Sequence, residues 1–130
     1  MEAEFIPYEQ ALALKELGFD EPCLGYFDPL YKQLVVWEKE STNSSSNWIS
    51  APLYQQAFRW FREKYNLRGF IGFRPNVKQF DCHIYDMSLS GKEYVKQRTM
   101  EEYNKDPKVG TYEEAELECL KKLIEIVKNK

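Results

Sequence analysis

The sequence predicts an α+β fold: a four-stranded antiparallel sheet built from two helix–strand–strand units, with helices packed on one face, followed by a C-terminal helix. The main observation is a repeat, because three segments begin with Tyr, two Glu or Gln residues and Ala, and each leads into a helical pattern. They start at Tyr8, Tyr54 and Tyr112. After each of the first two come two short apolar runs with a proline in the turn between them, which is typical of a hairpin. Four antiparallel strands covered by helices on one face are the simplest way to bury these elements.

The first unit is expected over residues 7–40. Pro7 suits the first turn of a helix, where its missing N–H needs no partner, and Gly18 suits the left-handed residue that ends one. These two residues predict a helix over residues 7–17. The hairpin that follows is predicted from its β-branched, aromatic and turn residues as a strand, a turn and a second strand over 22–27, 28–29 and 34–37.

The second unit is expected over residues 50–87, after a polar and flexible loop at 41–47. Ser50 is a suitable N-cap for its helix, and Ile49 is placed to pack on Tyr54 one turn later. The apolar residues that follow share one broad helical face, which indicates an amphipathic helix up to about Tyr65. The second hairpin is predicted over residues 70–74 and 80–87, with its turn at Pro75-Asn76.

The C-terminal helix is predicted over residues 111–128. Thr111 and Glu114 have the spacing of a capping box, which marks a helix start. The connection before it, residues 88–110, is long and polar, and connections of this length are often functional. Within it we predict a short surface helix over residues 92–104. The whole chain is expected to form one domain.

Composition narrows the function classes. The net charge of −3 among 130 residues disfavours a protein that binds nucleic-acid backbones. The beginning of the chain is acidic and no long apolar run follows, so we expect a cytoplasmic protein with no signal peptide and no membrane span. Cys23, Cys82 and Cys119 are far apart, which predicts free and mostly buried thiols. Aromatic residues make up 15% of the chain, more than its core needs, so some are expected in an interface or a binding site.

Several strings carry a resemblance to a known group of proteins. They are Tyr8 to Asp20, Pro52 to Tyr65 and the helix from Thr111 to Ile126. In these strings the chain resembles a family of small uncharacterised proteins encoded by bacteriophages, prophages and their hosts. The resemblance implies an accessory protein that acts on host machinery or host defence, and it carries no activity, cofactor or site residue with it.

Strand alternation supplies the candidate site. If Phe80, Cys82 and Ile84 face the helices, then Asp81, His83 and Tyr85 face away from them. By the same alternation the exposed face would also gain side chains from the other strands, namely Tyr26, Val35, Trp37 and either Phe73 or Arg74. Such an aromatic face suits a second subunit, a nucleic-acid base or a small planar ligand, and it would be core if residues 88–110 covered it.

Catalytic and metal sites have little support. His83 is the only histidine, and alternation sends Cys82 to the opposite face, so the two cannot form a nucleophile pair. We expect His83 to be half-buried and hydrogen-bonded to Asp81 or to the backbone. No ligand spacing for zinc and no phosphate-binding loop is present, so neither a metal nor a cofactor is predicted.

The sequence therefore favours a non-enzymatic binding protein for a host protein or a nucleotide-like small molecule. The predicted contacts are Tyr26, Trp37, His83 and Tyr85, with Arg74 or Lys78 supplying positive charge. If these residues do not bind, the loops at 41–47 and 88–110 are the next candidates. The alternatives are a homodimeric assembly protein that uses the same face, and a small hydrolase or nuclease with an unidentified acidic site.

Overall fold

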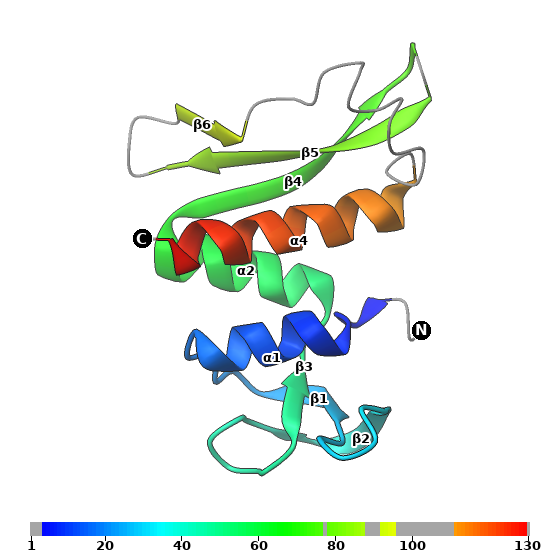
Figure 1. The fold of residues 1–130 in the computed structure, drawn as a ribbon, viewed down its shortest axis with the longest axis vertical. Helices are drawn as coiled ribbons and strands as arrows, with labels where there is room; N and C mark the ends of the chain where they lie inside the picture. The colour runs from blue at the N-terminus through cyan, green and yellow to red at the C-terminus, as the bar shows by residue number, and fades with distance from the viewer. Residues whose placement is uncertain (1–3, 77, 88–91, 96–110, 130) are drawn as a thin grey trace. The chain divides into compact units, whose positions relative to one another are not determined.

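The computed structural model describes residues 4–76, 78–87, 92–95 and 111–129, and it confirms the α+β class (Figure 1). The chain divides into two compact units, Met1–Gln56 and Ala57–Lys130. Its elements in order are α1 (Tyr8–Glu16), β1 (Cys23–Phe27), β2 (Leu34–Ser41), β3 (Ile49–Ala51), α2 (Tyr54–Tyr65), β4 (Leu67–Arg74), β5 (Gln79–Asp86), β6 (Lys92–Val95) and α4 (Tyr112–Lys128).

The predicted four-stranded sheet is wrong, because each hairpin belongs to its own three-stranded antiparallel sheet. The strand orders are β2-β1-β3 and β4-β5-β6. Each hairpin gains a third strand that the sequence patterns did not predict, β3 in one sheet and β6 in the other. These added strands pair with β1 and β5, so both edges of each central strand are already hydrogen-bonded. The two hairpins are therefore not joined in one ladder.

Helix α1 ends at Glu16, and its C-cap Leu17 is followed by a left-handed glycine, as predicted. Gly18 has φ 95°, a conformation that glycine adopts without steric cost. The N–H of Phe19 donates to the carbonyl of Leu14 at 2.9 Å, and the N–H of Gly18 donates to that of Lys15 at 3.1 Å. This pair of bonds is a Schellman motif, and its usual apolar contact is supplied by the buried side chains of Phe19 and Leu14.

The first sheet turns one face toward α1 and the N-terminal segment. The Tyr8 and Phe27 rings meet edge to face at 5.6 Å between centroids. A Cβ at Gly25 would lie 2.7 Å from the Phe5 ring, so only glycine allows the N-terminal segment to pack this closely on β1. The core of this unit therefore lies between α1 and one face of β1 and β3, and the opposite face carries Tyr26.

The start of α2 differs from the prediction. Ser50 lies in β3, where it pairs with Tyr26, and it is not the N-cap of the helix. The helix begins at Tyr54 instead, because Pro52 and Leu53 are held in an extended segment. The Pro52 carbonyl accepts the Ile6 N–H at 3.0 Å, and Leu53 forms a bridge with Phe5. The backbone partner at the N-terminus thus keeps this stretch out of the helix.

In the second unit, α4 packs along β4 and β5 (Figure 1). These strands pair without interruption from Leu67↔Asp86 to Arg74↔Gln79, which confirms the predicted hairpin. A Cβ at Gly69 would lie 3.0 Å from Cys119 Sγ and from Leu123, so this glycine marks the close approach of α4 to the sheet.

The predicted start of α4 is also confirmed. Thr111 is its N-cap, and the threonine hydroxyl accepts the Glu114 N–H at 3.2 Å. The short helix predicted over residues 92–104 is wrong where it can be compared, because residues 92–95 pair with β5 as a strand. The remainder of that predicted helix lies outside the described residues.

Candidate functional site

The predicted contact residues are divided between the two sheets. Tyr26 and Trp37 lie on β1 and β2 of the first sheet, whereas Arg74, His83 and Tyr85 lie on β4 and β5 of the second. Lys78 is exposed in the turn between β4 and β5, with φ 53°. One continuous aromatic face is therefore replaced by two separate groups of side chains.

The group on the first sheet forms a pocket of about 390 Å³. This volume is within the range of small-molecule sites, which is about 300–1,000 Å³. The pocket is lined by Tyr26, Trp37, Lys39, Glu40, Ser41, Ser46 and Trp48. The Trp37 ring lies between the other two aromatic rings: its centroid is 5.9 Å from that of Tyr26 at 67°, and 5.7 Å from that of Trp48 at 58°. We call the cavity that these seven residues line the aromatic pocket.

A β-bulge in β2 opens the space for this pocket. Between the pairs Gly25↔Val36 and Cys23↔Ser41, β1 advances two residues while β2 advances five. Residues 37–40 of β2 lie between these two pairs and are not matched with β1 in this register, and we call this stretch the arch. Bulges of this kind are common beside functional sites, where they redirect side chains. Strand alternation alone does not predict one.

The Tyr26 hydroxyl bridges the gap that the bulge leaves. It lies 2.6 Å from the Cys23 carbonyl and 2.8 Å from the Lys39 carbonyl, and these two acceptors share its single proton. The side chain is buried, with 3% of its surface exposed. Burial raises the pKa of Tyr26, and the Glu40 carboxylate raises it further. Tyr26 thus forms the floor of the aromatic pocket, and its hydroxyl is occupied by the backbone.

The loop at 41–47, predicted to be flexible, is tied to the rest of the unit by hydrogen bonds. The Asn43 side chain donates to the Phe19 carbonyl at 2.7 Å and accepts the Ser50 N–H at 2.9 Å. The Ser44 N–H donates to Asp20 at 2.7 Å, and the hydrogen bonds from Ser44 lower the pKa of that carboxyl. These bonds fix the loop that carries Trp48 to the pocket.

Trp48 is the aromatic residue of the pocket that was not predicted from the sequence, and Lys39 and Glu40 were not predicted either. It precedes Ile49 and Ser50, which were assigned to a helix start, so strand alternation was not applied to this segment. The pattern Trp48-Ile49-Ser50-Ala51 also fits a short strand, and that interpretation would have placed Trp48 and Ser50 on the face of Tyr26.

Three hydroxyl groups of the pocket, those of Tyr26, Ser41 and Ser46, have hydrogen-bond partners inside the protein. The Ser46 hydroxyl accepts the Trp48 N–H at 3.0 Å, and the Ser41 and Ser45 hydroxyls are 3.0 Å apart. What the pocket offers to a ligand is therefore aromatic surface, with the charges of Lys39 and Glu40 at its lining.

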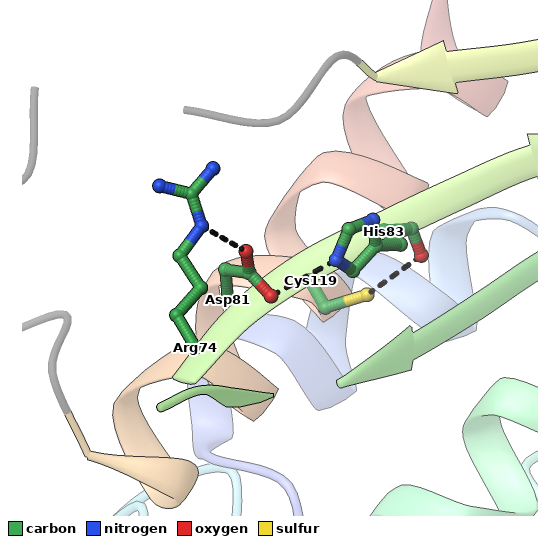
Figure 2. A network of polar contacts seen from close by, with 4 residues as sticks. All are labelled: Arg74, Asp81, His83 and Cys119. Carbon is green, nitrogen blue, oxygen red and sulfur yellow. Dashed lines mark hydrogen bonds and ion pairs between the residues drawn. The ribbon is translucent and has the colours of Figure 1, made fainter. Parts of the chain in front are cut away.

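The group on the second sheet is a charged cluster around Asp81. Figure 2 shows its carboxylate between the Arg74 and His83 side chains. Asp81 Oδ2 lies 3.2 Å from Arg74 Nε, and Asp81 Oδ1 lies 2.9 Å from His83 Nε2. Only 1% of the Asp81 surface is exposed. The expectation that His83 is half-buried and bonded to Asp81 is therefore confirmed.

A row of stacked rings continues this face. The Phe70 ring lies 4.9 Å from His83 at 11° and 5.7 Å from Tyr85 at 2°, while the Arg68 guanidinium lies 5.7 Å from the Phe70 centroid. Strand pairing explains the row, because Phe70↔His83 and Arg68↔Tyr85 are opposite residues and opposite residues share a face.

The cysteines lie apart from this face. All three thiols are free, with Cys23 and Cys119 buried. Cys119 Sγ lies 4.0 Å from the His83 backbone carbonyl, not from its ring (Figure 2). A hydrogen bond with Cys82 and burial raise the pKa of Cys119. Cys82 therefore faces α4, as predicted. Among the described residues no hydrogen bond joins a cysteine thiol to the His83 ring.

Two other features, a metal site and a membrane-spanning helix, are absent from the described residues. Over these parts of the chain, no three His, Cys, Asp or Glu side chains come together as a metal site. No helix in them has the length and apolar character needed to cross a membrane.

Comparison with known proteins adds no relative. The chain matches no protein-family model, no curated protein and no solved structure. The resemblance to phage-encoded proteins therefore stays a prediction.

Proposed function

We propose that this chain is a non-catalytic binding protein whose aromatic pocket holds a small ligand. The observation that supports this proposal is the meeting of Tyr26, Trp37 and Trp48 around one pocket of about 390 Å³. Apolar and aromatic walls with a few polar groups are the usual composition of a small-molecule site. Trp37 keeps 56% of its surface exposed, far more than a core residue of its size.

The charged cluster of the second sheet supports a structural role better than a catalytic one. Its carboxylate is already ion-paired with Arg74 through one oxygen and hydrogen-bonded to His83 through the other. Such pairing stabilises a buried charge and does not by itself supply acid–base chemistry. The hydrolase alternative therefore has less support than binding.

The sequence gives the proposal a context. An accessory protein of a phage or prophage would bind a host molecule, either a protein or a nucleotide-like compound, and could act against host defence. Two ligand chemistries suit aromatic walls next to Lys39 and Glu40: a planar ring with an anionic group, and a cation. Self-association through the same face stays an alternative.

The test is a ligand screen on the wild-type protein and two pocket variants. We expect a bound small molecule to raise the melting temperature of the wild type, because it binds only the folded state. Trp37→Ala and Trp48→Ala should each weaken binding by about 30-fold, the equivalent of about 2 kcal/mol for an aromatic anchor.

The matched control is Leu30→Ala. Leu30 is 77% exposed in the turn between β1 and β2 and does not line the pocket, so this variant should bind like the wild type. If Trp37→Ala and Trp48→Ala remain folded and bind every ligand found as tightly as the wild type, the pocket is not the site.

A further inference from the structure

The Trp37 ring meets both of its aromatic neighbours in the pocket at steep angles. It is tilted by 67° to Tyr26 and by 58° to Trp48, so it runs parallel to neither of them. A flat ligand ring gains most between parallel rings that face each other across a gap. A rounded group gains from several ring faces at once, which is how aromatic cages hold quaternary ammonium ions.

The hydrogen bonds within the pocket also favour a ligand of this rounded kind. Two backbone carbonyls share the proton of the Tyr26 hydroxyl, and the Ser46 hydroxyl accepts the Trp48 N–H. A nucleotide base or a primary amine would bring several donors and acceptors that need partners when buried. A fully alkylated ammonium has no N–H to satisfy and loses little in such surroundings.

The charge of Glu40 is placed to favour a cation. Glu40 lines the pocket, and its carboxylate adds to the effect of burial in raising the pKa of Tyr26 at the pocket floor. No basic side chain of the protein occupies the ring faces: in the described part of the chain, the lysine and arginine approaches lie over Tyr8, Trp60, Tyr65 and Phe70. Lys39 also lines the pocket, so the two lining charges make opposite predictions for the ligand.

We propose that the ligand of the aromatic pocket is a small molecule with a fully alkylated ammonium head group, held by Tyr26, Trp37 and Trp48 and balanced by Glu40. This inference rests on the proposed function and specifies its ligand class. A trimethylammonium group of the choline type is the simplest representative.

The test compares three probes by titration with tryptophan fluorescence or calorimetry. Choline supplies the cation, 3,3-dimethylbutan-1-ol has nearly the same shape without the charge, and adenosine monophosphate supplies a planar anion. We expect choline to bind at least about tenfold more tightly than the neutral alcohol, because a desolvated cation–π contact contributes that much or more. Trp37→Ala should weaken choline binding by about 30-fold, whereas Trp37→Phe should weaken it less.

Two charge variants separate the ligand classes. For an ammonium ligand, Glu40→Gln should weaken binding several-fold, and Lys39→Gln should leave it unchanged or strengthen it. For an anion the order is reversed. Both residues are exposed, so neither substitution should alter the unfolding midpoint, which serves as the folding control.

The outcomes distinguish this inference from the proposed function. Binding of adenosine monophosphate without choline, lost in Trp37→Ala and weakened by Lys39→Gln, would overturn the ammonium ligand and leave the binding function standing. Equal binding of choline and the neutral alcohol would overturn the role of charge. If none of the three probes binds the folded wild type, the ammonium inference fails, and the wider ligand screen then decides the binding function separately.

Discussion

Asp81 shows how one residue organises the outer face of the second sheet. A buried carboxylate is strongly destabilising unless cationic or hydrogen-bonding partners surround it. Arg74 and His83 supply such partners from β4 and from β5 itself. Gly72 makes the arrangement possible, because a Cβ there would lie 2.7 Å from Asp81 Oδ1 and 2.8 Å from His83 Nε2.

Replacing this carboxylate tests the structural role of the cluster. We expect Asp81→Asn to lower the free energy of unfolding by about 3 kcal/mol, because it leaves the Arg74 guanidinium without its counter-charge. The matched control is Glu125→Gln on α4, which breaks an exposed pair with Lys122 at 3.5 Å. That variant should change the free energy by less than about 1 kcal/mol.

Urea denaturation followed by circular dichroism measures both variants. Equal stability of Asp81→Asn and the wild type would contradict a structural role and would reopen the acidic-site alternative. Retained ligand binding by Asp81→Asn is expected in any case, since the aromatic pocket belongs to the other sheet.

Some of these residue contacts could be predicted and some could not. The bond between His83 and Asp81 follows from strand alternation, because residues two apart share a face. The Arg74 contact requires the register of β4 against β5, in which Gly72 stands opposite Asp81. A single sequence does not give that register, so Arg74 was predicted as a source of positive charge and as one of two alternatives for the exposed face, and not as the partner of Asp81.

At the level of elements, the bulge in β2 is the feature that connects the fold to the pocket. It interrupts the ladder between β1 and β2, and the Tyr26 hydroxyl replaces the missing strand contacts by bonding both backbones. Removing that hydroxyl while keeping the ring is therefore a direct test of what holds the arch.

We expect Tyr26→Phe to lower the free energy of unfolding by about 1–3 kcal/mol, because buried carbonyls would lose their donor. Tyr31→Phe is the matched control, since Tyr31 is 71% exposed. Chemical denaturation of both variants gives the comparison, and amide hydrogen exchange within β2 should accelerate only in Tyr26→Phe. If the two variants are equally stable, the arch is held by other contacts.

The elements that could be predicted are those with local signals. Pro7 and Gly18 bound α1, and the capping box at Thr111 begins α4, because caps depend only on neighbouring backbone groups. Strands β3 and β6 were missed because they are short and exist through pairing with β1 and β5. Their tertiary partners override local preferences that favoured a helix cap at Ser50 and a surface helix over residues 92–104.

At the scale of the whole molecule, two sheets share one chain and one helix crosses the boundary between the units. Helix α2 begins at Tyr54 in the first unit and continues from Ala57 in the second. Both parts of the helix carry buried side chains, Tyr54 in the first unit and Phe61 in the second. Unfolding α2 would thus remove core side chains from both units, which favours a single cooperative transition.

The cysteines provide a reporter for each unit. Cys23 lies in the first unit and Cys119 in the second, and both are buried in the folded chain. Burial raises the pKa of Cys23 to about 12, with a further contribution from Glu21. The pKa of Cys119 is raised as well, by its hydrogen bond with Cys82 and by burial. Because the thiolate is the reactive form, neither residue should react with iodoacetamide near pH 8 until its surroundings unfold.

We therefore expect Cys23 and Cys119 to become labelled at the same urea concentration. The measurement equilibrates the chain with urea, labels it with a short pulse of iodoacetamide at pH 8 and quantifies the labelled peptides by mass spectrometry. Cys82, which is only partly buried, serves as the internal comparison within the second unit. Labelling of Cys23 at a clearly lower urea concentration than Cys119 would contradict the single-domain prediction, because it would mean that the first sheet unfolds while α4 and the second sheet remain folded. The aromatic pocket would then belong to a unit whose stability can be measured alone, and a pocket ligand should move the Cys23 midpoint without moving that of Cys119.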